Sequence, residues 1–271
     1  MRLIACLFCA LTIAGCATAA KPPAPGADQP ATDTPGSLTP GEAYTRGMEL
    51  RDANRVEEAR RYMLSAAERG DKEAQFELGL WYMTGNRGVP IDFARAAKWV
   101  EQAAEQGQHD ALSYVWQLYF YGKGVAQSDP QAFQWLQRGA GAGNAMSSYY
   151  LGLFYYEGIA TAPDHAEAAV WFLDAADAGI GGASYYLGVM HLDGDGVPRS
   201  EDDAFYWFER GAAADHPASM LATGDMYAQG SGVRRNLEQA RAWYRQAVAQ
   251  GDDTEVQSAA AQRLRDLAKP D

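Results

Sequence analysis

Cysteine is missing from nearly the whole of this sequence. All three cysteines, Cys6, Cys9 and Cys16, fall within the first sixteen of its 271 residues. The rest of the chain can therefore form no disulfide bond and no metal site built on thiolates. We expect the folded part to be stabilised by packing alone.

Histidine is scarce too, and the common catalytic motifs are missing. The sequence has no His-x-x-x-His metal pair and no Gly-x-Ser-x-Gly nucleophile motif. Residues 191–202, HLDGDGVPRSED, partly resemble a calcium-binding loop, but a histidine stands at the first ligand position. We therefore expect no metal, no cofactor and no enzymatic activity. The four histidines lie in different segments and are His109, His165, His191 and His216.

Basic residues are outnumbered by acidic ones. The chain has 23 Lys and Arg against 35 Asp and Glu, a formal net charge of −12 and a pI of about 4.8. A nucleic-acid partner needs Lys and Arg to neutralise its phosphates, and anionic lipid headgroups need them likewise. We expect neither kind of partner.

The N-terminus carries an apolar run of the length found in export signals. Residues 1–15 combine the basic Arg2 with an apolar stretch from Leu3 to Ile13, which is too short to span a membrane. Residues 13–16, Ile-Ala-Gly-Cys, resemble the bacterial lipobox, in which the cysteine is acylated and becomes the mature N-terminus. Cys16 is therefore the expected lipid anchor. The alternative is an ordinary signal peptide with a coincidental cysteine.

A proline-rich tether follows Cys16. By the same resemblance, Ala17 in place of aspartate indicates the bacterial outer membrane, with the domain facing the periplasm and bound to the membrane through lipid only. Residues 16–40 contain six prolines and few large apolar residues. At about 3.1 Å per residue, this tether could hold the folded domain up to roughly 70 Å from the membrane.

A tryptophan recurs every 36 residues through the remaining chain. Seven positions before each stands a residue that can cap a helix N-terminus, and eight positions after it stands a glycine in four of the five copies. Each window, such as residues 164–179, predicts a capped helix whose tryptophan is buried. The tryptophans are Trp99, Trp135, Trp171, Trp207 and Trp243, and the caps are Asp92, Ser128, Asp164, Ser200 and Asn236.

A second helical pattern lies between the tryptophan helices, from residues 74–85 to residues 219–230. Its apolar and aromatic positions are spaced at i, i+4 and i+8, which places them on one face of a helix. A glycine at the sixth position lets the neighbouring helix approach closely, and a glycine-rich loop such as residues 194–197 ends the pattern. The repeating unit is therefore a helical hairpin.

The combined pattern, A-x-x-x-L-G-x-x-Y-x-x-G-x-G-V followed by D-x-x-x-A-x-x-W-x-x-x-A-A-x-x-G, resembles the Sel-one-like repeat, a relative of the tetratricopeptide repeat. The resemblance implies an all-α solenoid of antiparallel hairpins over residues 41–269. Trp116 departs from the pattern because it replaces the close-packing glycine. Asn54 is expected to cap the second helix of the first hairpin. The expected units are a degenerate repeat at 41–72, repeats at 73–108, 109–144, 145–180, 181–216 and 217–252, and a capping helix at 253–269.

By analogy with tetratricopeptide arrays, the first helix of each hairpin would line a concave groove. Residues 148–156, SYYLGLFYY, are apolar or aromatic on every side of a helix, which exceeds what packing within one hairpin plainly needs. Two interpretations stay open: the rings line a binding groove, or they are buried between hairpins. The groove candidates are Phe120, Tyr121, Tyr149, Leu153, Tyr156, Tyr185 and Val189.

The resemblance implies protein binding and no reaction. The favoured function is a non-enzymatic scaffold or adaptor, tethered to the membrane on the periplasmic side, that holds a segment of a partner protein in the aromatic groove. The alternative is a periplasmic immunity or inhibitor protein that covers the active site of a toxic secreted enzyme. A basic partner would suit the acidic charge.

The lipobox interpretation can be tested by fractionation. Cys16→Ser should move the protein from detergent-extracted membrane to the soluble periplasm, because the lipid anchor is lost and no core residue changes. Circular dichroism should show the same helicity for both forms. Identical fractionation of the two proteins would contradict the anchor.

Overall fold

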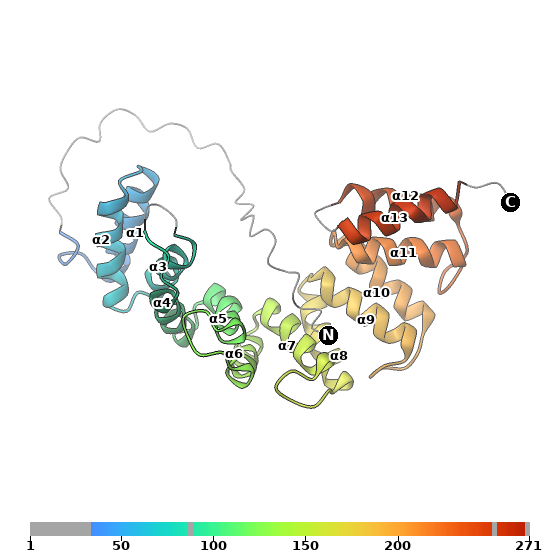
Figure 1. Ribbon diagram of the computed structural model, residues 1–271, viewed down its shortest axis with the longest axis horizontal. Helices are drawn as coiled ribbons and strands as arrows, with labels where there is room; N and C mark the ends of the chain where they lie inside the picture. The colour runs from blue at the N-terminus through green and yellow to red at the C-terminus, as the bar shows by residue number, and fades with distance from the viewer. Residues whose placement is uncertain (1–33, 86–88, 251–253, 269–271) are drawn as a thin grey trace. The chain divides into compact units, whose positions relative to one another are not determined.

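The computed structural model describes residues 34–85, 89–250 and 254–268, and in these ranges it is all helical, without a strand (Figure 1). The expected export signal, Cys16 and the tether as far as residue 33 lie outside the described residues. The helices are α1 (Pro40–Asp52), α2 (Val56–Glu68), α3 (Lys72–Thr84), α4 (Phe93–Glu105), α5 (His109–Tyr121), α6 (Asp129–Gly141), α7 (Ala145–Glu157), α8 (His165–Asp177), α9 (Gly181–Asp193), α10 (Glu201–Ala213), α11 (Pro217–Gln229), α12 (Leu237–Ala249) and α13 (Thr254–Asp266).

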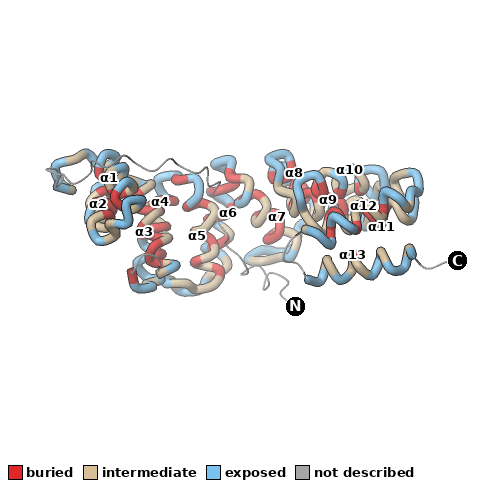
Figure 2. The backbone as a smooth tube through the Cα atoms, turned by 90° about the horizontal axis from the view of Figure 1, so that it is seen from above, coloured by how far each residue is buried: buried red, intermediate tan, exposed pale blue. Residues whose placement is uncertain are grey.

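The helices pack as successive hairpins, which confirms the expected solenoid architecture. Each odd-numbered helix from α1 to α11 packs on the helix that follows it, and each even-numbered helix also packs on the start of the next hairpin. Buried positions recur from hairpin to hairpin and do not gather in one centre (Figure 2). The last helix, α13, packs on α12 and α11 and buries only Ala260. Stability is therefore a sum over neighbouring hairpins.

The predicted N-caps of the tryptophan helices are confirmed. In every case the capping side chain accepts a hydrogen bond from a backbone N–H of the first helical turn, which satisfies a group that the helix itself cannot pair. These caps are Asp92, Ser128, Asp164, Ser200 and Asn236.

The first hairpin differs from the expectation in two places. Asn54 is not the cap of α2: it adopts a φ of 61°, and the cap residue is Arg55, which makes no capping hydrogen bond through its side chain. The folded unit also begins earlier than residue 41, at Pro35. Leu38 packs on the first core cluster, and Thr39 caps α1 with Glu42 in a capping box. The tether's last residues therefore belong to the fold.

The prediction that each of the five tryptophans is buried is confirmed for two of them and wrong for three. Trp99 and Trp135 are buried, but Trp171, Trp207 and Trp243 keep part of their surface in water. The residue after each tryptophan is at most 2 % exposed. These residues form the ladder of the core and are Val100, Leu136, Phe172, Phe208 and Tyr244.

The core ladder packs on the glycines of the partner helices. A methyl group on Gly152 would lie 2.7 Å from the Phe172 ring, and one on Gly188 would lie 2.5 Å from the Phe208 ring. Gly79 meets Val100 and Gly224 meets Tyr244 in the same way. The glycine at the sixth position of the sequence pattern therefore lets the neighbouring helix approach closely, as predicted, and a large side chain of that helix packs on it.

The corrected register gives a stability prediction. Phe172→Ala should lower the free energy of unfolding by about 3–5 kcal/mol, because it empties a filled space in the core. Trp171→Ala should lower it by only about 1–2 kcal/mol, because part of the Trp171 ring is already in water. Urea denaturation of both variants tests this. Equal losses would contradict the corrected register, because they would mean that Trp171 is buried as fully as Phe172.

The glycine-rich loops also join neighbouring hairpins. A methyl group on Gly124 would lie 1.9 Å from the Phe93 carbonyl oxygen, and one on Gly232 would lie 2.1 Å from that of Glu201. Both glycines have positive φ, as does Ala160 at the equivalent place in the third loop, at 63°. Ala160 therefore holds a left-handed conformation that disfavours a side chain.

Relief of this strain should be measurable. Ala160→Gly should raise the free energy of unfolding by about 0.5–1 kcal/mol, the strain of a left-handed alanine less the chain entropy of glycine. The matched change Gly124→Ala should lower it by about 1–3 kcal/mol, because the added methyl meets backbone. Denaturant melts of the two variants should move in opposite directions, and a shift in the same direction would contradict the loop contact.

Candidate functional site

A row of tyrosines connects the first helices of three successive hairpins. Tyr114 of α5, Tyr150 of α7 and Tyr186 of α9 stand 36 residues apart and occupy the same helical position; we call them the tyrosine row. Tyr150 lies 4.4 Å from Trp116 of the preceding first helix, between ring centroids. Tyr114 similarly lies 5.7 Å from Phe76, and Tyr186 lies 5.6 Å from Tyr156. Each member of the row therefore contacts a ring of the preceding first helix.

Trp116 gives the row its closest ring contact. The departure from the glycine pattern places this indole in the core, at 2 % exposure, against Tyr150 and Phe154 of the next hairpin. Its Nε1 donates a hydrogen bond to the Ser113 carbonyl, 3.0 Å away. Trp116, which departs from the repeat pattern, therefore fills space between two hairpins and packs against Tyr150.

Two of the seven groove candidates are buried and do not line a surface. Phe120 is 8 % exposed because its ring is enclosed by Trp116, Tyr121 and Phe154. Leu153 is 5 % exposed in a core cluster with Phe172. The other five are partly exposed, namely Tyr121, Tyr149, Tyr156, Tyr185 and Val189.

The partly exposed rings both pack between helices and border the surface, so each of the two interpretations holds in part. Tyr149 and Tyr156 lie 6.2 Å and 6.3 Å from Phe172, so they pack on the core ladder as well as bordering the surface. Tyr185 lies 5.7 Å from Phe208 in the second helix of its own hairpin. Truncation of any of these rings would therefore disturb folding. A substitution that tests binding has to keep the aromatic ring.

The three phenol hydroxyls of the tyrosine row are open to a partner protein. Among the described residues, no protein group pairs with the hydroxyls of Tyr114, Tyr150 or Tyr186. Burial raises the pKa of all three phenols, so they stay uncharged at neutral pH. Tyrosines with an apolar body and an unpaired hydroxyl are typical of protein interfaces. We call α5, α7 and α9, with the tyrosine row at their centre, the aromatic surface.

Acidic groups border the aromatic surface. The pKa of Tyr156 is raised first by burial and then by the charges of Asp195, Asp193 and Glu157. Glu157 also raises the pKa of Tyr186, and Asp110 that of Tyr114. The surface therefore favours a partner that brings Lys or Arg, whose cations also pack well on aromatic faces.

The acidic loop after α9 has a structural contact. Asp195 pairs with Nδ1 of His165, and Nε2 of the same ring lies 3.1 Å from the Tyr156 carbonyl oxygen. The Tyr156 ring stacks on His165 at 4.8 Å. These contacts connect the loop to the start of α8.

Sequence reasoning missed the tyrosine row although its signal is present. Its members recur at intervals of 36 residues, but the sequence pattern placed the groove at the preceding position, which holds Tyr149 and Tyr185. No three His, Cys, Asp or Glu side chains gather to hold a metal ion in the part of the chain that is described. There, too, none of the helices has the length and apolarity that a membrane crossing requires.

Comparison with known proteins places the chain in a family. The model of the Sel1 repeat matches six segments, at residues 41–71, 72–108, 111–144, 145–180, 182–216 and 217–252. No functionally curated protein matches the chain in sequence.

Two solved structures are similar over most of the chain. One is a protective antigen of uropathogenic Escherichia coli with an SLR fold, at 29 % identity and a TM-score of 0.78 over 86 % of this chain and 50 % of the antigen. This chain therefore spans half the length of that antigen. The other is a Sel1 repeat protein of Oxalobacter formigenes, at 27 % identity and a TM-score of 0.72 over 78 % of this chain and 86 % of that one. With six matching repeats and these structural relatives, the chain belongs to the Sel1 repeat family.

Proposed function

We propose that this protein is a scaffold that binds a partner protein across the aromatic surface of α5, α7 and α9. Sel1 repeat proteins generally mediate protein–protein interaction, typically without catalysis. The observation that carries the proposal is the tyrosine row, three equivalent rings that each contact a ring of the preceding first helix and whose hydroxyls have no partner among the described residues.

The proposed partner presents a basic segment. Glu157 lies near enough to act on Tyr186 of the row, and Asp193 and Asp195 act with it on the neighbouring Tyr156, so this end of the aromatic surface is negative. A segment with Lys or Arg would pair with these carboxylates and lay its apolar stems on the rings. We further propose that the scaffold faces the periplasm and is held at the bacterial outer membrane by lipid on Cys16. The resemblance of residues 13–16 to the lipobox supports this location.

A second function has one observation in its favour. The same acidic border suits an immunity or inhibitor protein that covers a basic, toxic secreted enzyme. Such a partner would form a one-to-one complex and lose its activity in it. A scaffold partner would keep its activity.

Site-specific cross-linking in the native envelope tests the proposed surface. A photoreactive phenylalanine analogue in place of Tyr150 or Tyr186 should capture the same protein, because both rings border one binding surface. The controls carry the analogue at Val170 of α8 or Tyr206 of α10, which are 57 % and 53 % exposed. Capture only from Val170 and Tyr206 would place the binding surface on the second helices and contradict the proposal.

Affinity for the captured protein then tests the hydroxyls. Tyr150→Phe and Tyr186→Phe keep the ring contacts, so unfolding should change by less than about 0.5 kcal/mol. Partner binding should weaken by about 0.5–1.5 kcal/mol for each lost hydrogen bond. In the control Tyr244→Phe, the lost hydroxyl donates to Asp225 at 2.7 Å, so stability should fall while affinity holds. Unchanged affinity in both row variants would contradict the assignment.

A further inference from the structure

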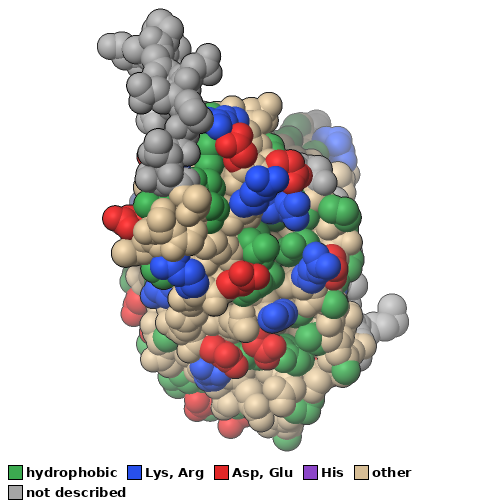
Figure 3. All heavy atoms as spheres, turned by 90° about the vertical axis from the view of Figure 1, so that its left-hand side faces the viewer, with side chains coloured by type: hydrophobic (Ala, Val, Ile, Leu, Met, Phe, Trp, Pro, Cys, Tyr) green, Lys and Arg blue, Asp and Glu red, His purple; other side chains and the backbone are tan. Residues whose placement is uncertain are grey.

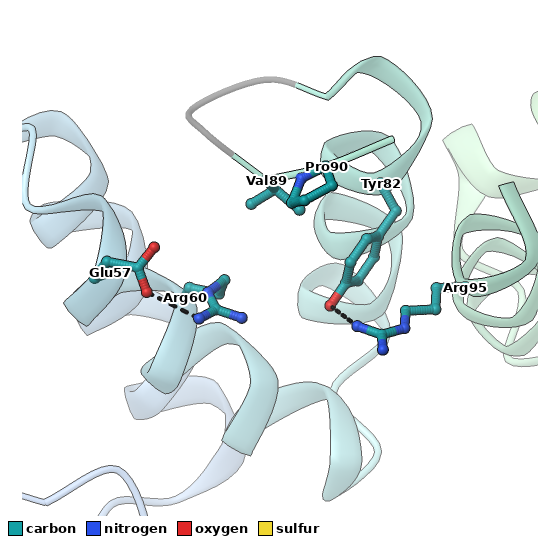
Figure 4. Close-up of a pocket in the computed structure, with 6 residues that line it drawn as sticks. All are labelled: Glu57, Arg60, Tyr82, Val89, Pro90 and Arg95. Atoms are coloured by element: carbon teal, nitrogen blue, oxygen red, sulfur yellow. Dashed lines mark hydrogen bonds and ion pairs between the residues drawn. The ribbon is translucent and has the colours of Figure 1, made fainter. Parts of the chain in front are cut away.

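A pocket of about 270 Å³ lies between α2, α3 and the start of α4 (Figure 4). It is away from the aromatic surface of α5, α7 and α9, and it does not depend on the function proposed above. Two guanidinium groups, one phenol and one carboxylate point toward it, and two apolar side chains complete its wall. The lining residues are Glu57, Arg60, Tyr82, Val89, Pro90 and Arg95.

Neighbouring side chains hold the two arginines in place. Nη2 of Arg60 donates to Glu57 at 2.8 Å, one turn earlier in α2. Nη1 of Arg95 donates to the Tyr82 hydroxyl at 3.4 Å, and its Nε lies 3.2 Å from Asp92. Tyr82 is 6 % exposed, so its hydroxyl is a fixed point of the wall. The two guanidinium groups therefore face the pocket, although most of the Arg95 side chain is in water.

One donor of the pocket has no acceptor. Nε of Arg60 is buried and, among the described residues, it is the one buried side-chain nitrogen or oxygen without a hydrogen-bond partner. A buried donor left unpaired is costly, and native proteins seldom keep one without a reason. The Glu57 hydrogen bond and then the nearby Tyr82 hydroxyl raise the pKa of Arg60, so the group is always charged. An acceptor from outside the protein would satisfy Nε.

The charges around the pocket disfavour a dianion. Arg60 and Arg95 contribute two positive charges, and their partners Glu57 and Asp92 contribute two negative charges, so no excess positive charge is present to hold a doubly charged ligand. The face of the molecule that α1 and α2 present shows basic and acidic side chains side by side, so no broad positive field favours a dianion there (Figure 3). Ion pairs such as Arg46–Glu49 and Arg55–Glu58 give α1 and α2 this alternation.

We propose that this pocket binds a carboxylate group, with its two oxygens on the guanidinium groups of Arg60 and Arg95 and its carbon chain along Val89 and Pro90. Guanidinium groups match the planar, two-oxygen geometry of a carboxylate. The Tyr82 hydroxyl accepts from Arg95 and keeps its own proton to donate to the same anion. Two sources carry this chemistry, the C-terminus of a protein chain and a free small organic acid.

Nuclear magnetic resonance of the arginine Nε–H groups of the full chain reads out binding at the site itself. N-acetyl-leucine should shift the Nε–H signals of Arg60 and Arg95 in a saturable manner, and N-acetyl-leucine amide should not, because it lacks the carboxylate. Arg95→Gln should weaken binding about tenfold or more, and Tyr82→Phe should weaken it severalfold. The matched control is Arg234→Gln, at an exposed arginine of the loop before α12, and should bind as the unaltered chain does.

Acetate distinguishes the two sources of the carboxylate. Weaker binding of acetate than of N-acetyl-leucine indicates a chain terminus, and equal binding indicates a small acid. The proposal is overturned if the amide shifts the two Nε–H signals as the acid does, if inorganic phosphate binds more tightly than N-acetyl-leucine, if no saturable shift occurs, or if Arg95→Gln binds unchanged.

Discussion

The contact on which this solenoid depends is the seating of a large side chain on a glycine of its partner helix. Phe172 on Gly152 and Phe208 on Gly188 bring the two helices of a hairpin close enough to exclude water. A hairpin of two 13-residue helices buries too little surface to be stable alone, so each one also relies on its neighbours. The fold is therefore a chain of local contacts, repeated with small changes.

The aromatic surface begins where this contact is altered. Trp116 stands in α5 where the other first helices of α3 to α11 have glycine, and its ring turns the packing toward Tyr150 and Phe154 of the next hairpin. The tyrosine row continues through Tyr186 and ends at Ala222 in α11. A departure from the repeat thus gives three hairpins a shared surface, which suits a binding role better than a uniform stack would.

Features that repeat at a fixed spacing were predictable from the sequence, and the choice between adjacent apolar residues and the pocket between three helices were not. The caps and the glycine positions follow from local spacing, as Asp164 and Gly152 illustrate. Spacing alone does not separate Trp171 from Phe172, because adjacent apolar residues both lie on the inner half of a helix and the neighbouring helix decides which is covered. The arginine pocket was not predictable, because its lining residues come from separate elements and spacing along the sequence does not show that they meet.

A double-mutant cycle between Gly152 and Phe172 tests the central contact most directly. If the ring is seated on the glycine, Gly152→Ala should be strongly destabilising in the unaltered chain and much less so when Phe172→Leu has shortened the side chain. The cycle should then show a coupling free energy of about 1–3 kcal/mol. Additive losses within about 0.5 kcal/mol would mean that the two residues do not share a contact, and would contradict this account of the hairpin.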